Sequence, residues 1–311
     1  MVPLGRRLVT ILGPTACGKT AVAVELARHV GGAILSCDSR QLYRGMDIGT
    51  GKDLAEYGQG AGRVPYYLID IAEAGARLSL FDYVAAFKSA YEEVSQLGLV
   101  PILCGGTGLY AEAILRGYRL STVGKDADFR AALEQQSTEE LVSRLASYGP
   151  LAEGLDVHNR RRLIRAIELA EAPDEATQPM LGTPLVSLGG VYVIAPDRDT
   201  RRQRIEQRLD YRLAHGLVEE VQGLLERGVP RETLLYYGLE YRMVTRYLMG
   251  AYTYEEMRGQ LLQAIWQFAK RQMTYWRGLE RRGVELTWLD GQLAPEALVE
   301  AILRQEGCIT I

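Results

Sequence analysis

The sequence lacks several features that would place it in a special class of protein. Its 311 residues include four cysteines, Cys17, Cys37, Cys104 and Cys308, and no two of them form a C-x-x-C pair. This distribution argues against structural zinc and predicts a reduced, cytoplasmic protein. The chain has no run of eighteen apolar residues, and residues 1–7 lack the apolar core of a signal peptide, so neither a membrane span nor secretion is expected.

Charge and composition also do not indicate a special class of protein. The formal net charge is −3, so nothing in the overall balance points to nucleic acid, and such a function must depend on local basic patches. Internal repeats and low-complexity segments are absent from the sequence. Apolar content of 47% and charged content of 24% are ordinary for a globular protein of one large or two modest domains.

One glycine-rich stretch carries the strongest signal in the chain. It follows an apolar run, residues 8–12, and precedes a helical pattern, residues 21–30. Strand, glycine-rich turn and helix form the context of a phosphate-binding loop (P-loop), whose backbone N–H groups and helix N-terminus bind an anion. Lys19 can reach the outer phosphates, and the hydroxyl of Thr20 can bind Mg²⁺. The predicted diphosphate site consists of Gly13, Pro14, Thr15, Ala16, Cys17, Gly18, Lys19 and Thr20.

Further apolar runs alternate with helical patterns and predict an α/β fold with a parallel sheet. The expected strands are residues 33–37, 65–71, 100–104, 190–195 and 284–290. Two of these strands end in polar loops, one at Asp38 and the other at residues 105–110, which include Thr107. Because ligands bind beyond the carboxyl ends of parallel strands, we expect Asp38 and Thr107 to lie near the P-loop. Asp38 would equally suit a helix N-cap.

Strand signals disappear between residues 117 and 184, where helices are expected at 129–136, 138–148 and 157–169. A helical insertion, residues 118–185, is therefore predicted within a P-loop core made of residues 1–117 and 186–311. The C-terminal part reads as mainly helical. The expected helices of that part are a strongly basic one that begins at residues 197–204 and continues through 205–215, then 218–227, 242–249 and 254–279, followed by a closing helix.

Basic residues cluster in two helical segments. Arg161, Arg162 and Arg165 lie within about one turn of each other, and residues 270–277 interleave basic and aromatic side chains. Interleaving of this kind suits phosphate contact with base stacking, and a buried aromatic stripe with a solvated basic face gives the same pattern. Lys52 lies in a loop rich in glycine and charge, where a solvated side chain is expected in preference to an anion ligand.

Two reaction classes fit these parts. No His, Ser or Cys stands out as a nucleophile. A kinase would use the P-loop for ATP and the arginine-rich insertion as a lid. Alternatively, the loop holds a diphosphate as leaving group, Asp38 acts as general base toward an amine, and Lys19 with Mg²⁺ stabilises the departing charge.

The motifs in their order resemble one family, the bacterial tRNA dimethylallyltransferases. The similarity covers nearly the whole chain, and the run from Asp38 to Thr50 is more specific than the P-loop. The resembling segments are residues 13–20, 38–50, 67–70, 105–110, 159–168, 204–213 and 269–272.

The resemblance implies that dimethylallyl diphosphate and Mg²⁺ bind at the P-loop. It implies prenyl transfer to the exocyclic amine of the adenine 3′ of the tRNA anticodon, a base flipped out of its stack. Asp38 matches the general base and Thr107 a substrate contact, and we expect a monomer whose insertion grips the anticodon arm. The tRNA-binding residues implied are Asp38, Ser39, Arg40, Gln41, Thr107, Arg130, Arg161, Arg162, Arg165, Lys270 and Arg271.

The chain also departs from the family pattern. Tyr236 stands where an arginine near the diphosphate is usual, Glu240 replaces a glycine, and Trp266 replaces an arginine of the RNA face. Arg242 is a candidate to compensate for the missing diphosphate cation. These departures leave three alternatives open: a prenyltransferase of free adenine nucleotides, a P-loop small-molecule kinase, and an RNA-binding paralogue without catalysis.

Overall fold

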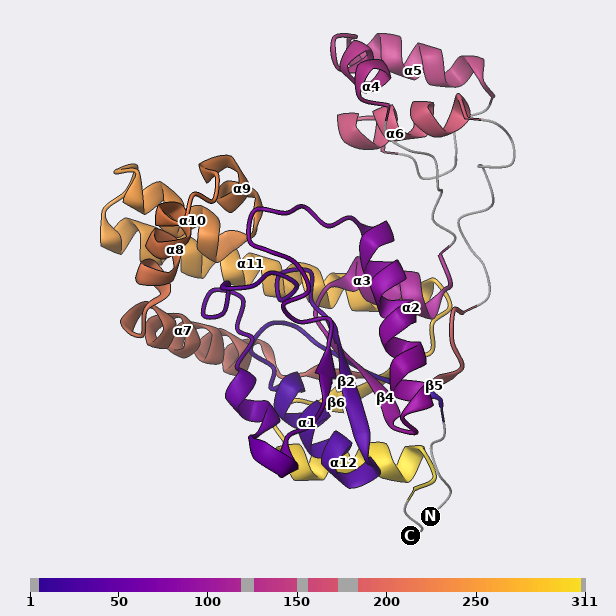
Figure 1. Cartoon of the computed structure of the whole chain (residues 1–311), viewed down its shortest axis with the longest axis vertical. Coiled ribbons are helices and arrows are strands. Elements are labelled where there is room, and N and C mark those ends of the chain that lie inside the picture. Colours follow the sequence, from indigo (N-terminus) through magenta and orange to yellow (C-terminus); the bar gives the residue numbers. More distant parts are fainter. Residues whose placement is uncertain (1–5, 119–125, 150–155, 173–183, 309–311) are drawn as a thin grey trace. The chain divides into compact units, whose positions relative to one another are not determined.

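The computed structural model describes residues 6–118, 126–149, 156–172 and 184–308. The chain divides into two compact units (Figure 1). The first unit consists of Met1–Arg116 and Pro184–Ile311, and the second of Gly117–Thr183.

The first unit is built on a six-stranded, fully parallel sheet with the order β3-β2-β4-β1-β5-β6. The N-terminal strand β1 lies inside the sheet, where Ile11 aligns with Cys104 of β4 and with Tyr192 of β5. The strands are β1 (Leu8–Leu12), β2 (Gly32–Cys37), β3 (Tyr66–Tyr67), β4 (Val100–Gly105), β5 (Leu188–Ala195) and β6 (Thr287–Asp290). The predicted α/β class with a parallel P-loop sheet is confirmed.

The central strands are continuous apolar runs because helices cover the sheet (Figure 1). Every residue of β1, β2 and β4 is buried. In one core cluster, Ile11 and Ile34 of the sheet join Leu26 of α1 (Lys19–Val30) and Ile302 of α12 (Pro295–Gln305). The turn between β1 and α1 is thus fixed to this buried core.

Helices start where the sequence supplies caps. Ser79 and Thr253 form capping boxes at α2 (Leu80–Gln96) and α11 (Tyr254–Arg281), and the Asp197 carboxylate caps α7. The other helices of the first unit are α3 (Gly108–Leu115), α7 (Arg198–Ala214), α8 (Leu217–Glu226), α9 (Arg231–Tyr236) and α10 (Leu239–Leu248).

Three expectations about local structure were wrong. The strand expected at residues 65–71 is reduced to β3, because Leu68 and Asp70 adopt positive φ angles of 64° and 56° that end the extended run. The short helix α9 was not foreseen. Helix α10 begins at Leu239, three residues before its expected start, because Gly238, with a φ of 132°, separates it from α9.

Lys52 also differs from its prediction, because it is a buried structural ion and not a solvated loop residue. Its side chain is 1% exposed, and Nζ donates to the carbonyl of Tyr43 at 2.7 Å and to the carboxylate of Asp47 at 2.6 Å. The carboxylate of Asp70 accepts a third hydrogen bond. Lys52 therefore joins the segment after β2 to the segment after β3.

We expect Lys52→Met to lower the free energy of unfolding by about 3 kcal/mol, since it leaves two carboxylates facing a buried site without their cation. Urea unfolding at constant m-value measures this loss. Asp47→Asn is the graded control, because Asp47 is 55% exposed and should cost less. A Lys52→Met protein as stable as the wild type would contradict a structural role.

The described part of the second unit holds three helices, α4 (Ala127–Glu134), α5 (Thr138–Ser147) and α6 (Arg160–Ala170). They pack around their own small apolar cluster, which includes Leu133, Leu141, Leu163 and Ile167. All three predicted helices of the insertion are present, and each end lies within three residues of its expected position.

A buried carboxylate organises the basic residues of this unit. The Glu168 side chain is 3% exposed and accepts hydrogen bonds of 2.9 Å from both Arg130 and Arg165. Arg161 and Arg162 are exposed on the first turn of α6. Of the four arginines of this unit that were predicted to contact tRNA, two, Arg130 and Arg165, thus also hold its helices together.

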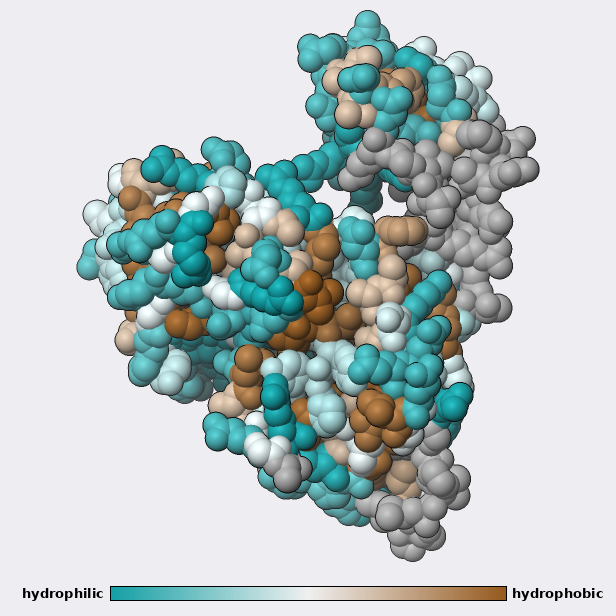
Figure 2. Space-filling model, in the orientation of Figure 1, coloured by the Kyte–Doolittle hydropathy of each residue, from teal (hydrophilic) through white to brown (hydrophobic). Residues whose placement is uncertain are grey.

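No helix among the described residues is both long and apolar enough to cross a membrane. The face shown in Figure 2 intersperses hydrophilic and hydrophobic residues.

Candidate functional site

The P-loop has the geometry that its sequence predicts. Gly18 is the N-cap of α1 and has a φ of 84°, a left-handed conformation that glycine adopts without strain. Thr15, Ala16, Gly18, Lys19 and Thr20 line a cavity of about 660 Å³. Gly13, Pro14 and Cys17 are buried, and Nζ of Lys19 lies 3.4 Å from the carbonyl oxygen of Pro14. This weak contact leaves the ammonium group available to an anion in the cavity.

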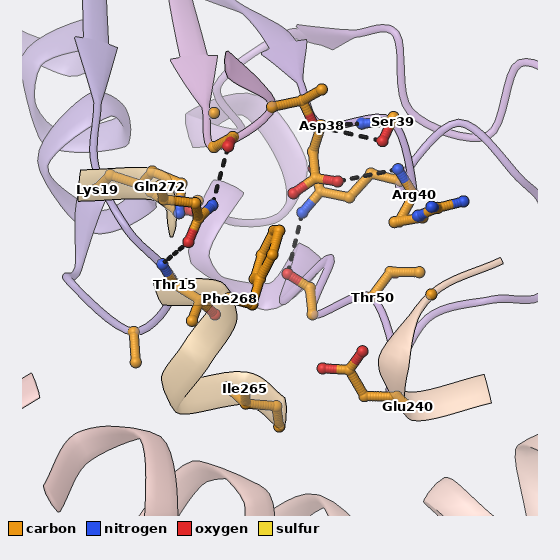
Figure 3. Close-up of a pocket in the computed structure, with 18 of the residues that line it drawn as sticks. Thr15, Lys19, Asp38, Ser39, Arg40, Thr50, Glu240, Ile265, Phe268 and Gln272 are labelled. Carbon is orange, nitrogen blue, oxygen red and sulfur yellow. Dashed lines mark hydrogen bonds between the residues drawn. The ribbon is translucent and has the colours of Figure 1, made fainter. Parts of the chain in front are cut away.

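Asp38 follows the last residue of β2 and lines the same cavity (Figure 3). Its carboxylate accepts a hydrogen bond of 2.9 Å from the backbone N–H of Arg40. Thr107, in the loop after the neighbouring strand β4, accepts a hydrogen bond of 3.0 Å from the N–H of Ser39. The parallel pairing of β2 with β4 therefore brings Asp38 and Thr107 together beside the P-loop, as the sequence predicts.

Gln272 connects these loops, a role that its sequence context did not predict. Its amide accepts a hydrogen bond of 2.9 Å from the N–H of Thr15 and donates one of 2.9 Å to the carbonyl of Gly106. The residue is 7% exposed on α11, in a row of buried positions that are otherwise mostly apolar, such as Ile265 and Ala269. A polar residue within that buried stripe is the signal that could have identified it.

The segment after Asp38 is held partly by the protein itself. The Gln41 amide accepts from the hydroxyl of Ser36 at 2.9 Å and donates to the carbonyl of Gly51 at 3.1 Å. The guanidinium of Arg40 lies 5.7 Å from the ring centroid of Tyr236. Arg77 lies 5.2 Å from the same ring. The predicted tRNA contacts of Ser39, Arg40 and Gln41 stay predictions.

Two further arginines of α7 line the cavity on the side of the P-loop. Arg208 donates a hydrogen bond to the hydroxyl of Thr15, and Arg212 lines the same cavity one turn further along the helix. Burial, reinforced by the charge of Arg212, lowers the pKa of Arg208 to about 10, which still leaves it charged at neutral pH. Arg204, Arg208 and Arg212 follow one another at intervals of four residues, which places them on one face of the helix. This spacing could have predicted that they act together.

Arg242, the candidate to compensate for Tyr236, also lines the cavity, and its Nε donates to the carbonyl of Leu235 at 2.9 Å. The cations on this side of the cavity therefore come from α7 as well as from α10.

The basic and aromatic residues of α11 separate by face. Lys270 and Arg271 are exposed, and both line a second hollow of about 550 Å³, while Arg271 also reaches the main cavity. Trp276 is fully buried. Trp266, at a position where an arginine was expected, lies under Arg202, whose guanidinium is 4.7 Å from its ring centroid. Residues 270–277 therefore include a buried aromatic side chain and a solvated basic face, which was one of the two interpretations of this segment.

Two thiols near the cavity, those of Cys37 and Cys104, are not activated. Burial raises the pKa of Cys37, and burial raises that of Cys104 to about 12, so both stay protonated at neutral pH. A protonated, buried thiol is a poor nucleophile. The carboxylates that line the cavity with the P-loop are those of Asp38, Asp53, Glu56 and Glu240.

The parallel sheet, with a glycine-rich turn between β1 and α1, defines a P-loop α/β protein of the NTPase-like type. Residues 41–279 match the model of the IPP transferase family. The chain belongs to this family.

Relatives of known name cover almost the whole chain. One named tRNA dimethylallyltransferase 1 from Porphyromonas gingivalis is 50% identical over 302 residues, 96% of this chain and 98% of that protein. Another of the same name from Geotalea daltonii is 45% identical over 96% of this chain and 95% of that protein. The crystal structure of a full-length tRNA isopentenylpyrophosphate transferase from Bacillus halodurans is 31% identical, with a TM-score of 0.69, and the match covers 97% of both chains.

Proposed function

We propose that this protein transfers the dimethylallyl group of dimethylallyl diphosphate to the exocyclic amine of the adenine 3′ of the anticodon in tRNA. One observation carries the proposal: Asp38 and the P-loop residues Lys19 and Thr20 face a single cavity. A general base and an anion cradle on one cavity are what an attacking amine and a leaving diphosphate require.

The walls of the cavity support an allylic substrate. Ile265 and Phe268 of α11 and Leu239 of α10 line it together with the charged residues (Figure 3). A cavity with a cationic end and an apolar wall suits a diphosphate that carries a short hydrocarbon chain, since the chain is removed from water there. This combination favours a prenyl donor over ATP.

The reaction then needs few protein groups. The adenine amine forms a bond to C1 of the prenyl group, and the C1–O bond breaks with its electron pair staying on the diphosphate. Asp38 accepts the proton that the amine loses, while Lys19 and the N-terminus of α1 hold the growing negative charge of the diphosphate. The hydrogen bond from Arg40 N–H orients the carboxylate of Asp38 toward this task.

The residues also fit Mg²⁺ that binds together with the diphosphate. Thr20 offers a hydroxyl on the cavity wall, and no group of three or more His, Cys, Asp or Glu side chains in the described segments could hold a metal by itself. Mg²⁺ commonly binds through one or two protein oxygens, substrate phosphates and waters. When bound, Mg²⁺ would neutralise charge on the leaving diphosphate.

The insertion would bind the anticodon arm. Arg161 and Arg162 are exposed cations at the start of α6, available for phosphate contacts. Lys270 and Arg271 offer a second basic surface on α11. The cavity is complete within one chain, which supports a monomer. The four cysteines of the chain are buried and free, which supports a protein that acts in the reducing cytoplasm.

The arginines of the insertion should separate into two functional groups. We expect Arg161→Met and Arg162→Met each to weaken tRNA binding. Each should also make the slope of log K against log salt concentration shallower by about one, and leave the stability of the protein unchanged. Arg130→Met should also lower the melting temperature, because Glu168 loses one of its two partners. Filter binding at several salt concentrations, together with thermal unfolding, tests both. Equal melting temperatures for all three variants would contradict the structural role of Arg130.

The function itself is tested by incubating the protein with Mg²⁺, dimethylallyl diphosphate and unmodified tRNA, followed by mass spectrometry of the nucleosides. We expect adenosine to gain one prenyl unit. Prenylation of AMP with no reaction on tRNA would shift the acceptor to free nucleotides. Phosphoryl transfer from ATP, without inhibition by prenyl diphosphates, would indicate a kinase.

A further inference from the structure

Arg212 on α7 is a buried cation with an unused hydrogen-bond donor. The residue is 7% exposed, and among the described residues its Nη2 has no hydrogen-bond partner. The nearest carboxylate oxygen in an ion pair, Oδ2 of Asp53, lies 3.8 Å away and belongs to a half-exposed side chain. A buried, unsatisfied guanidinium N–H is costly, so its retention points to a ligand that completes it.

The surrounding backbone is shaped to admit this side chain. A Cβ atom on Gly51 would lie 1.8 Å from Nη2 of Arg212, so only glycine leaves room for the guanidinium. Gly51 also has a φ of 64°, a conformation that side-chain-bearing residues rarely adopt. The carbonyl of Gly51 is held by Gln41, which places this contact next to the segment that carries Asp38.

Arg212 belongs to one wall with the P-loop. Arg208 lies one turn earlier on the same face of α7 and donates a hydrogen bond to Thr15 in the loop. Both arginines line the 660 Å³ cavity with Lys19. The buried charge of Arg212 and the half-buried charge of Arg208, one turn apart, repel each other, and an anion between α7 and the P-loop would remove that repulsion.

Glu240 is a second carboxylate, besides Asp53, whose charge acts on these arginines. It lies in the first turn of α10, at the position where the family pattern has glycine, and it points into the cavity (Figure 3). Burial raises the pKa of Glu240, the charges of Arg212 and Arg208 oppose that rise, and Asp38 reinforces it. A fixed carboxylate in an anion-binding cavity weakens anion binding, because the anion must replace it as the counter-charge of the cations there.

We propose that Arg212 is a diphosphate-binding residue of this chain and that Glu240 is the counter-charge it exchanges for the diphosphate. The inference rests on the proposed function. Nη2 of Arg212 would donate a hydrogen bond to a phosphate oxygen. The positive charge of the guanidinium would stabilise the negative charge that builds up on the diphosphate as the C1–O bond breaks. Arg212 and Arg208 would then supply the cation that Tyr236 does not.

Calorimetric titration with pyrophosphate and Mg²⁺ tests this without catalysis. We expect Arg212→Met to raise the dissociation constant about tenfold or more, because a charge-assisted hydrogen bond is lost. Glu240→Gln, which removes a negative charge at constant shape, should lower it severalfold. In the Arg212→Met background, Glu240→Gln should have a smaller effect, since the two groups act on each other. Arg246→Met on the exposed face of α10 is the control and should bind like the wild type.

Stability separates a binding role from a structural one. Arg212→Met removes a buried, unsatisfied charge, so the melting temperature of the free protein should rise or stay unchanged while pyrophosphate binding falls. If the variant is instead less stable and binds poorly, Arg212→Lys decides: recovered binding supports the inference, and no recovery overturns it. In steady state, Arg212→Met should raise the KM for dimethylallyl diphosphate and leave the KM for tRNA unchanged.

The outcomes distinguish a failure of the proposed function from a failure of the role assigned to Arg212 and Glu240. Wild-type protein that binds no pyrophosphate and transfers no prenyl group would remove the proposed function, and this inference with it. Active wild-type protein, with Arg212→Met and Glu240→Gln both binding pyrophosphate as tightly as the Arg246→Met control, would leave the function standing and overturn the inference alone.

Discussion

Replacing Asp38 with asparagine is expected to lower kcat for prenyl transfer to tRNA by about 10³-fold, within the range known for loss of a general base. Asparagine keeps an oxygen that can accept the hydrogen bond from Arg40 N–H, so the loop after β2 should hold its shape. It cannot accept the proton of the attacking amine. Single-turnover measurement with saturating tRNA and dimethylallyl diphosphate isolates this chemical step.

The control for Asp38→Asn is Asp199→Asn, the same change at an exposed carboxylate in the first turn of α7. Asp199→Asn should transfer prenyl groups at the wild-type rate. Asp38→Asn should bind pyrophosphate normally and unfold at the wild-type temperature. A variant that retains most of the wild-type single-turnover rate would show that another group, or water, takes the proton.

Lys19→Met should reduce kcat/KM for dimethylallyl diphosphate by about 10²- to 10³-fold, since it removes a cation aimed at the charge that develops on the leaving group. In the free protein, Nζ makes only a 3.4 Å contact with the carbonyl of Pro14. Removing it should therefore change the free energy of unfolding by no more than about 0.5 kcal/mol.

Lys88→Met, at an exposed position of α2, controls for the loss of one positive charge and should leave kcat/KM unaltered. The affinity for tRNA should be the same in both lysine variants. If Lys19→Met loses tRNA binding instead of pyrophosphate binding, the assignment of the P-loop to the diphosphate is wrong.

Local sequence patterns were sufficient to predict the frame of the site. The strand of residues 8–12, the turn ending at Gly18 and the helix beyond it depend on short-range rules, and the structure has them where expected. The convergence of Asp38 and Thr107 followed from one general property, that parallel strands end at the same edge.

The features that were missed depend on contacts distant in sequence. Gln272 meets Thr15 across 257 positions, and Arg208 meets it across 193. Lys52 looked like a solvated residue because its partner Asp70 lies in another loop. Such pairings are set by how helices dock on the sheet, which hydrophobic periodicity does not specify.

The bridge made by Gln272 limits how α11 can change length. Successive helical residues are rotated by about 100°, so inserting or deleting one residue between Tyr254 and Gln272 would swing the amide off the loops of Thr15 and Gly106. The same slip would turn Lys270 and Arg271 away from their present faces. A homologue can vary the composition of this helix. The number of residues between its start and position 272 can change only by about whole helical turns, which return the glutamine to the same face.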